Sequence, residues 1–207
     1  MPNTLWKIRD FLAEQAEKPH QYNLIQRFFG SQKMWENFVS LYIAQDAPEY
    51  ILDIGCGTAE IIPYLAPGIS YVGIDSNSRY IASCRKRYPE QLFILGDWSS
   101  LSQRIFRPPE LILCLGLLHH LDSNSARILL RECYEVLQKG GKIISLDGAK
   151  QDDCGRFEAI FYQADRGRFI RGLQGYASLF PQQPETSLHK NWLRVPYRYA
   201  VCELIKR

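Results

Sequence analysis

The chain has 207 residues, 46% of them hydrophobic, and a formal net charge of +3 at pH 7, which fits one globular domain with a full hydrophobic core and no second domain. The charge balance is too even to require a nucleic-acid partner. No segment approaches the roughly 20 apolar residues that cross a bilayer, and the first residues lack the apolar core of a secretory signal, so we expect a cytoplasmic protein with no membrane partner.

Two amphipathic helices are predicted before residue 49. The first runs from Thr4 to Lys18, and the second runs from Ser31, its expected N-cap, to about Gln45. The second helix has an apolar stripe at intervals of three and four residues. The stripe consists of Met34, Trp35, Phe38, Val39, Tyr42 and Ile43.

The segment from Tyr50 to Glu60 predicts a buried strand that ends in a ligand-binding turn. Apolar residues form the strand, and Gly55 and Gly57 allow backbone torsions that other residues resist. A helix is expected from Ala59 to Leu65, and a helix start after such a turn lets a small molecule approach the main chain.

The charges at this turn favour one cofactor class over another. Dinucleotide enzymes need G-x-G-x-x-G because a pyrophosphate lies on the helix N-terminus. Here Glu60 stands at the third glycine position and Asp53 stands just before the turn. Two acids would repel a pyrophosphate, but they suit a ligand with an ammonium and a sulfonium group, as in S-adenosyl-L-methionine.

The residues Leu52-Asp-Ile-Gly-Cys-Gly-Thr58 resemble motif I of the class I S-adenosylmethionine-dependent methyltransferases. The chain departs from that motif mildly at Ala59, where the family commonly has another glycine. The resemblance implies that the methionine end of the cofactor is bound by Asp53, Gly55, Cys56 and Gly57.

A second strand is predicted from Ser70 to Asp75, about 20 residues beyond the glycine turn, which is the separation of one βαβ crossover. A carboxylate at this position can accept hydrogen bonds from both ribose hydroxyls, with Ser76 beside it. The alternative is that Asp75 caps the helix expected from Ser78. That helix should turn Ile81, Cys84 and Tyr88 inward and expose Arg85, Lys86 and Arg87 to solvent.

The third strand is predicted at Gln91 to Leu95, and Asp97 and Trp98 follow it. In the methyltransferases that the chain resembles, an acid here accepts the adenine amino group and its neighbour donates a backbone N–H. The resemblance assigns these roles to Asp97 and Trp98, whose ring can also pack on adenine. A purely structural Asp97 in a turn is the alternative.

The fourth strand, Glu110 to Leu115, is apolar as a central parallel strand should be. Ligands of open α/β sheets gather where the strand order reverses, between strands one and four. The reactive methyl group is therefore expected near Leu115, Gly116 and the pair His119-His120, which resembles motif IV of small-molecule methyltransferases. Either histidine can serve as a general base, with His120 slightly favoured, or contact the cofactor region or cap the next helix.

The rest of the core that resembles this family is predicted to be a helix from Ser123 to Lys139 and a fifth strand from Lys142 to Asp147. Leu137 to Ile144 resembles the family's motif before strand five. At the end of the chain, Trp192 to Ile205 predicts two strands, of which Tyr197 to Ile205 suits the last strand of a closing antiparallel hairpin.

Acceptor binding is expected from residues outside this core. Tyr162 and the arginines Arg166, Arg168 and Arg171 could clamp an acceptor carboxylate or phosphate. The arginines could equally pair with nearby aspartates and hold a lid. N-terminal extensions of class I methyltransferases often cover the cofactor, which suggests Tyr22 and Gln26 as contacts, although simple core packing of the aromatic segment 22–30 is the stronger alternative.

The six cysteines show no C-x-x-C pair and no metal-ligand spacing, so we expect buried thiols and no metal. Four of them fall on apolar or turn positions: Cys56, Cys84, Cys114 and Cys133.

We therefore expect an α/β fold with a doubly wound, mostly parallel seven-stranded sheet, a C-terminal antiparallel hairpin and helices on both faces. A helical cap at 1–48, a cofactor-binding core at 49–148 and a substrate-side segment at 149–207 would form one domain. The expected activity is methyl transfer from S-adenosyl-L-methionine to a small-molecule acceptor, with S-adenosyl-L-homocysteine as product. An RNA or protein methyltransferase and a non-catalytic cofactor-binding protein are the alternatives, and no Asn-Pro-Pro-Tyr motif follows strand four to favour base methylation.

Overall fold

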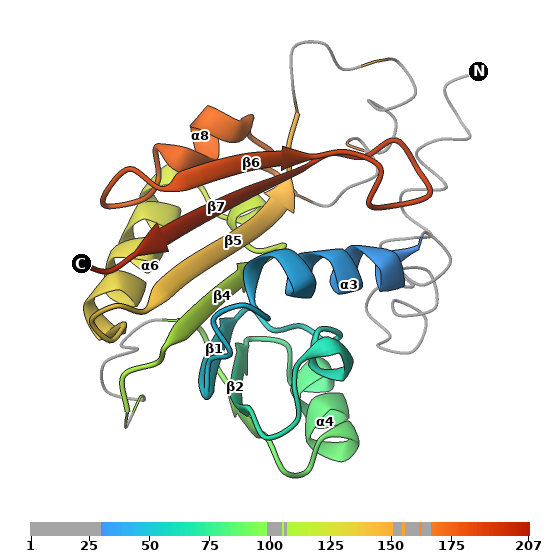
Figure 1. Ribbon diagram of the computed structural model, residues 1–207, viewed down its shortest axis with the longest axis vertical. Helices are drawn as coiled ribbons and strands as arrows, with labels where there is room; N and C mark the ends of the chain where they lie inside the picture. Colours follow the sequence, from blue (N-terminus) through green and yellow to red (C-terminus); the bar gives the residue numbers. More distant parts are fainter. Residues whose placement is uncertain (1–29, 99–104, 106, 151–154, 156–161, 163–166) are drawn as a thin grey trace.

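A computed structural model (Figure 1) describes residues 30–98, 105, 107–150, 155, 162 and 167–207. The helix predicted at 4–18 and the aromatic segment before Gly30 lie outside the described residues. So do Tyr22, Gln26 and Arg166.

The described chain forms a seven-stranded sheet in the order β3-β2-β1-β4-β5-β7-β6. The first five strands are parallel, and β7 runs antiparallel to both of its neighbours. This topology confirms the predicted fold, with β1 and β4 side by side where the order reverses. The strands are β1 (Tyr50–Ile54), β2 (Ser70–Asp75), β3 (Leu92–Leu95), β4 (Leu111–Leu115), β5 (Lys142–Gly148), β6 (Glu185–His189) and β7 (Tyr199–Ile205).

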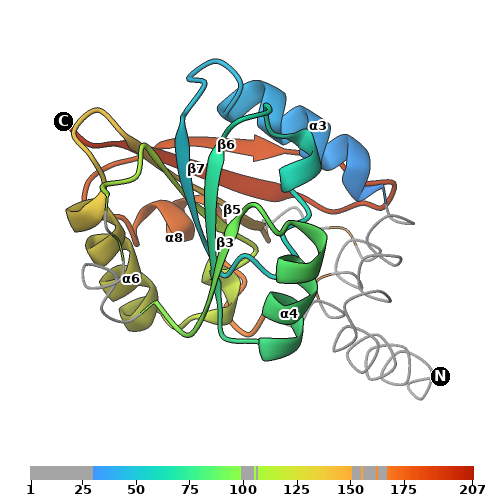
Figure 2. The ribbon, with the colours of Figure 1, turned by 90° about the horizontal axis from the view of Figure 1, so that it is seen from below.

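Helices cover both faces of the sheet (Figures 1 and 2). On one face, α3 (Ser31–Tyr42) and α4 (Ser78–Arg87) pack against strand residues such as Ile51. On the other, α6 (Ser123–Val136) and α8 (Leu173–Ala177) pack against residues such as Leu52. Because successive side chains of a strand point to opposite faces, the apolar runs of the central strands supply both core layers at once.

The prediction of a helix from Ala59 to Leu65 is wrong. Only a 3-10 turn, η1 (Ile62–Tyr64), forms there. Ala59 adopts a positive φ of 54°, outside the right-handed helical region, and Pro63 cannot donate a backbone hydrogen bond. The glycine turn therefore does not lead into an α-helix, and a helix N-terminus does not contribute to the site.

Two further predictions need correction at the ends of elements. Ser31 is buried and lies inside α3, whose N-cap is Gly30 in a left-handed conformation. The residues from Trp192 to Val195 form no strand, and the partner of β7 in the hairpin is β6, Glu185–His189. The buried stripe of α3 is confirmed, with Met34, Phe38, Val39 and Ile43 in the core.

The inward face of α4 is confirmed, since Ile81 and Cys84 are buried. Two of its three basic residues are more than a solvated face, however. Arg85 donates to the carbonyl oxygen of Phe93, and Arg87 pairs with Glu60 at 2.6 Å. These arginines tie α4 to β3 and to the turn after β1.

No helix within the described ranges is long and apolar enough to cross a membrane.

Gly73 in the middle of β2 allows β2 to pack closely against the turn after β1. A Cβ atom at this position would lie 2.8 Å from Cys56 Sγ and 2.9 Å from Phe93 Cδ1. We expect Gly73→Ala to lower the free energy of unfolding by about 1–3 kcal/mol, because overpacking forces neighbours apart. Urea denaturation should leave the control Gly155→Ala near wild type, since a Cβ there would meet no atom of the described residues within 4 Å; equal effects would contradict close packing at Gly73.

Candidate active site

The carboxyl ends of the parallel strands place the turns after β1, β2 and β4 next to one another. The N–H groups of Gly55 and Cys56 both donate to the carbonyl oxygen of Ile74, at 2.7 and 3.0 Å. A Cβ at Gly55 would lie 2.9 Å from Leu117, so this turn also packs on the turn after β4. Gly57, at a φ of 54°, has open space where a Cβ would stand.

Asp75 at the end of β2 joins two of these turns. Its Oδ2 accepts the Gly57 N–H at 2.9 Å, and its Oδ1 accepts the Asn77 N–H at 2.7 Å. The N-cap of α4 is Asn77, which accepts from Arg79 and Tyr80. Asp75 is therefore not the helix cap, and its half-buried carboxylate lies at the glycine turn.

Asp53 is buried, with 2% of its surface exposed, and its Oδ2 accepts a 2.5 Å hydrogen bond from the Tyr71 hydroxyl. Burial raises the pKa of this carboxyl to about 7, the Tyr71 bond opposes the shift and the charge of Asp75 adds to it. Its other oxygen, Oδ1, is buried without a hydrogen-bond partner in the described chain. Such an unpaired acceptor beside the turn fits a cationic ligand group.

The charge pattern on which the choice of cofactor class depends differs from the expected one. Glu60 is paired with Arg87, so its charge is compensated within the protein. The acids that face the turn are instead Asp53 and Asp75. Asp75 and not Glu60 is therefore the second acid that would repel a pyrophosphate at this turn.

The residues expected at the adenine lie after β3, at the same edge of the sheet. Gly96 donates its N–H to the Asp75 carbonyl oxygen at 3.0 Å, which fixes the start of this segment. Asp97 is exposed, and Trp98 is half-buried against the core layer under α6. Ser76 is exposed next to Asp75.

The two adjacent histidines have different environments. His119 is buried in the turn η2 (Leu118–His120), and its Nδ1 lies 2.7 Å from Asp147 Oδ1 on β5. The same oxygen accepts the His119 backbone N–H at 3.1 Å. His120 is exposed, its ring 4.2 Å from that of His119. Asp147 is not among the site residues predicted from the sequence, although an acid that ends a buried apolar strand was the available signal.

Arg171 holds the histidine turn in place. Its guanidinium donates to the carbonyl oxygens of Leu118, Leu121 and Phe169, at 2.8 to 2.9 Å, and lies 3.3 Å from Ser123 Oγ. The Phe169 N–H in turn donates to the His119 carbonyl oxygen. The donors of Arg171 are thus directed at the protein's own main chain.

The other expected acceptor contacts are divided. Arg168 is exposed beside Phe169. The hydroxyl of Tyr162 is used structurally, since it donates to the Ala149 carbonyl oxygen at 2.7 Å and accepts the Arg198 N–H. Leu115 is partly buried, and Gly116, exposed with a φ of 66°, ends β4.

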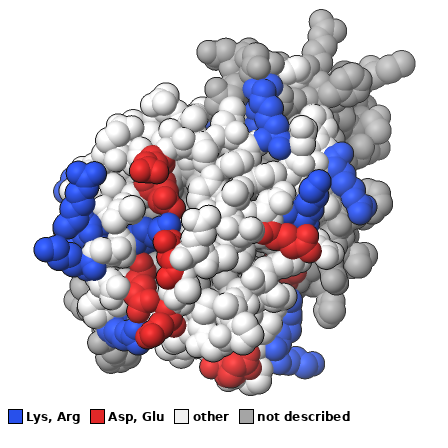
Figure 3. Space-filling model, in the orientation of Figure 1, with Lys and Arg blue, Asp and Glu red and all other residues white. Residues whose placement is uncertain are grey.

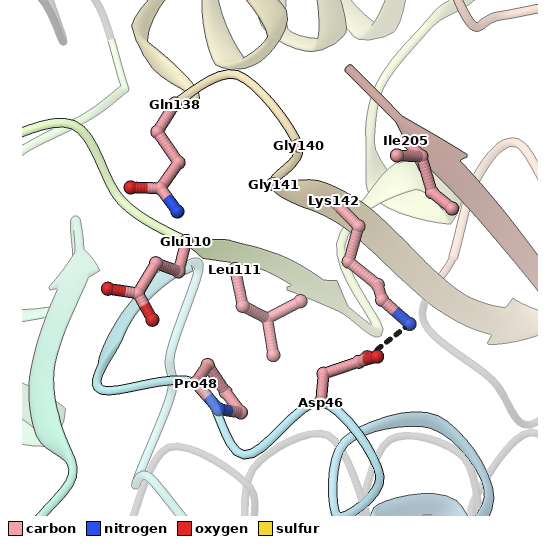
Figure 4. Close-up of a pocket in the computed structure, with 9 residues that line it drawn as sticks. All are labelled: Asp46, Pro48, Glu110, Leu111, Gln138, Gly140, Gly141, Lys142 and Ile205. Carbon is pink, nitrogen blue, oxygen red and sulfur yellow. Dashed lines mark ion pairs between the residues drawn. The ribbon is translucent and has the colours of Figure 1, made fainter. Parts of the chain in front are cut away.

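A pocket of about 320 Å³ lies at the opposite edge of the sheet, at the amino ends of β4 and β5 (Figure 4). Its charged residues already have partners, because Asp46 pairs with Lys142 and Glu110 pairs with Arg107. Ligands of open α/β sheets bind at the carboxyl ends of the strands. We therefore place the active site at the glycine turn and not in this pocket.

Comparison with known proteins shows which family the core of the chain resembles. Residues 51–141 match a family described as "Methyltransferase domain". The core of this chain is similar to that methyltransferase family. The matched segment contains β1 to β4, the glycine turn, Asp75 and both histidines of η2. Five cysteines of the domain and its surroundings are free and buried, including the four expected to be.

Individual relatives of this chain differ in what they act on. A demethylmenaquinone methyltransferase of Thermotoga maritima is 31% identical over 137 residues, 64% of this chain and 57% of the relative. An 18S rRNA (guanine-N(7))-methyltransferase of Bos taurus is 27% identical over 64% of this chain and 50% of the relative. The chain thus spans about half the length of these curated relatives.

A solved structure extends the similarity to nearly the whole chain. The plantazolicin methyltransferase BamL, in complex with a triazolic desmethylPZN analog and SAH, has a TM-score of 0.66 at 15% identity. The similarity covers 97% of this chain and 98% of that one. At this identity the likeness establishes a shared fold.

Asp53 should make the stability of the unliganded protein depend on pH. Its pKa is about 7 in the folded protein and 3.8 in an ordinary environment, so the folded state holds more protons between these values. The stability that protonated Asp53 contributes is complete below about pH 4 and is lost as the pH rises through about 7, by at most about 1.4 kcal/mol per pH unit.

Urea unfolding of the wild type and Asp53→Asn at pH 5 to 8 measures this contribution as a difference, in which other titrating groups cancel. We expect the stability of the variant to rise relative to wild type as the pH increases. Tyr71→Phe should extend the loss to higher pH, since the hydroxyl lowers the pKa of Asp53. A difference between wild type and Asp53→Asn that is constant with pH would contradict the assignment.

Proposed function

We propose that this protein transfers a methyl group from S-adenosyl-L-methionine to a small-molecule acceptor and releases S-adenosyl-L-homocysteine. The observation that carries the proposal is the group of carboxylates at the glycine turn. The Asp75 carboxylate lies at the end of β2, and a buried Asp53 oxygen lacks a partner in the described chain. The methyltransferase domain and the fold shared with an SAH-bound enzyme support it.

Each part of the cofactor has candidate residues at the strand ends. Asp53, Gly55, Cys56 and Gly57 would hold the methionine end, where the acids favour its ammonium group. Asp75 and Ser76 would hold the ribose, and Asp97 and Trp98 the adenine. When bound, the cofactor supplies a methyl group already activated by a sulfonium. The main chain of Leu115 and Gly116 would line the position where the acceptor is aligned with it.

The acceptor is proposed to be a metabolite-sized molecule. On the face shown in Figure 3, basic and acidic side chains are interspersed among uncharged ones, and no continuous basic area spans the described part of this face. Such an area would be needed to track a nucleic-acid backbone. Arg168 is the arginine best placed to meet an acceptor anion, because Arg171 is already bound to main-chain carbonyls. Buried free thiols fit the reducing cytoplasm, where we place the protein.

Two other functions remain as alternatives with distinct outcomes. The similarity to the bovine rRNA enzyme favours RNA as the acceptor. A non-catalytic cofactor-binding protein would have the same acids at the strand ends. An RNA methyltransferase and a non-catalytic protein would bind the cofactor at the glycine turn in the same way. The two are therefore distinguished by whether the methyl group is transferred, and to which molecule.

Removal of the Asp75 carboxylate should weaken cofactor binding at least tenfold, because charge-assisted hydrogen bonds are worth about 1.5–3 kcal/mol. Calorimetric titration with S-adenosyl-L-homocysteine measures the change in Asp75→Ala. Asp75→Asn retains an acceptor for one of the two N–H groups and so separates charge from the shape of the turn. Glu60→Gln is the control and should bind within about threefold of wild type; an unchanged affinity in folded Asp75→Ala would remove Asp75 from the site.

Methyl-labelled S-adenosyl-L-methionine, incubated with the protein and a metabolite extract, tests the activity directly. We expect label in a low-mass product, and none with Asp75→Ala at a cofactor concentration that saturates only the wild type. Label recovered in added RNA would instead establish the RNA enzyme. Tight cofactor binding without label in either fraction would favour the non-catalytic protein.

A further inference from the structure

We propose that Asp147 is a positioning residue that makes His119 the general base, and that the acceptor is a hydroxyl compound whose oxygen must lose its proton. This inference rests on the proposed methyltransferase function and specifies the acceptor class. Asp147 lies outside the segment matched by the family, residues 51–141. It is also not among the site residues predicted from the sequence.

Asp147 holds His119 at two points. One carboxylate oxygen, Oδ1, lies 2.7 Å from the ring Nδ1 and 3.1 Å from the backbone nitrogen of the same histidine. The side chains are 9% and 1% exposed, so little water competes for these bonds. Because main chain and ring are held by the same atom, rotation of the imidazole would break a buried hydrogen bond.

This contact determines which ring nitrogen is basic. A carboxylate beside Nδ1 favours the tautomer with the proton on that nitrogen, which leaves the lone pair on Nε2. A proton gained at Nε2 would produce an imidazolium next to the buried carboxylate, which stabilises it. The second carboxylate oxygen, Oδ2, has no hydrogen-bond partner among the described residues, so its charge is not already compensated by another donor there.

The position of the ring suits a base at the methyl-transfer site. A Cβ at Gly116 would lie 3.7 Å from His119 Cε1, so this ring edge borders the end of β4. The turn is held from the other side by Phe169, which donates its N–H to the His119 carbonyl oxygen, and by Arg171 on Leu118 and Leu121. His120, next to this pair, is exposed, whereas His119 is the histidine bound to the buried Asp147.

The chemistry of the pair limits the acceptor. In the proposed step the acceptor O–H bond breaks, its proton passes to His119 Nε2, and the electron pair stays on oxygen. That oxygen bonds the methyl carbon as the carbon–sulfur bond breaks, and the electron pair of that bond goes to sulfur, which leaves as S-adenosyl-L-homocysteine. His119 later returns the proton to water. An acceptor carboxylate is already ionised at neutral pH and would need no base. Among oxygen acceptors, the geometry therefore points to a hydroxyl group and a methyl ether product.

Nitrogen-15 NMR of the full chain with S-adenosyl-L-homocysteine tests the pair without any acceptor. The four histidines of the chain give few ring signals, and His119→Gln identifies the relevant ones. We expect His119 to be protonated at Nδ1, and to become a tautomer mixture in Asp147→Ala but not in Asp122→Asn, whose carboxylate caps α6 nearby. Protonation at Nε2 in the wild type would overturn the proposal even if methyl transfer is active.

Kinetics with the acceptor found in the labelling experiment give the second test. Asp147→Asn should lower kcat by about 10²-fold or more, the usual contribution of general-base catalysis, with KM and S-adenosyl-L-homocysteine affinity within about twofold. His119→Gln should lose as much, His120→Gln less. A kcat of Asp147→Asn within about threefold of wild type, or an alkali-labile methyl ester as product, would overturn the proposal and leave the methyltransferase function intact.

Discussion

The hydrogen bond from the Gly57 N–H to Asp75 Oδ2 is the interaction on which the site depends. It joins the end of β2 to the glycine turn after β1 and so fixes the outline of the space beside that turn. Because the helix expected after the glycine turn does not form, this hydrogen bond is more important for the shape of the site. In many α/β proteins a helix N-terminus supplies positive potential at this position, but here only the short turn η1 follows, and backbone shape and carboxylate charge remain.

Two buried carboxylates extend this arrangement to both faces of the sheet. Asp53 shares the face of Ile51 under α3 and α4, and Asp147 shares the face of Ile143 under α6. Each has one oxygen bound to a neighbouring side chain and one without a partner in the described residues. Unsatisfied buried acceptors destabilise a fold, and their place at the strand ends is the place where a bound ligand or proton would compensate them.

The strands of the parallel core could be predicted from the sequence because each is a short apolar run bounded by turn residues. This pattern is typical of a fully buried strand. Edge and turn elements were harder. Strand β6 has alternating, half-exposed polar residues and no apolar run to mark it, and Ala59 gave no sign of its positive φ. The pairing of His119 with Asp147 joins residues 28 positions apart, so it depends on strand order, which local patterns do not encode.

The arginine-rich segment shows why side-chain type alone did not determine a role. By residue type, Arg171 and Arg168 are both plausible anion ligands. Of the two, Arg171 has its planar guanidinium beside three carbonyl oxygens in and around η2, and it donates hydrogen bonds to all three. A lysine could not span these acceptors in the same way. Because Phe169 and Arg171 attach this segment to the histidine turn, any acceptor contact made by exposed Arg168 would be held in fixed relation to His119, so recognition and proton removal would depend on one shared anchor.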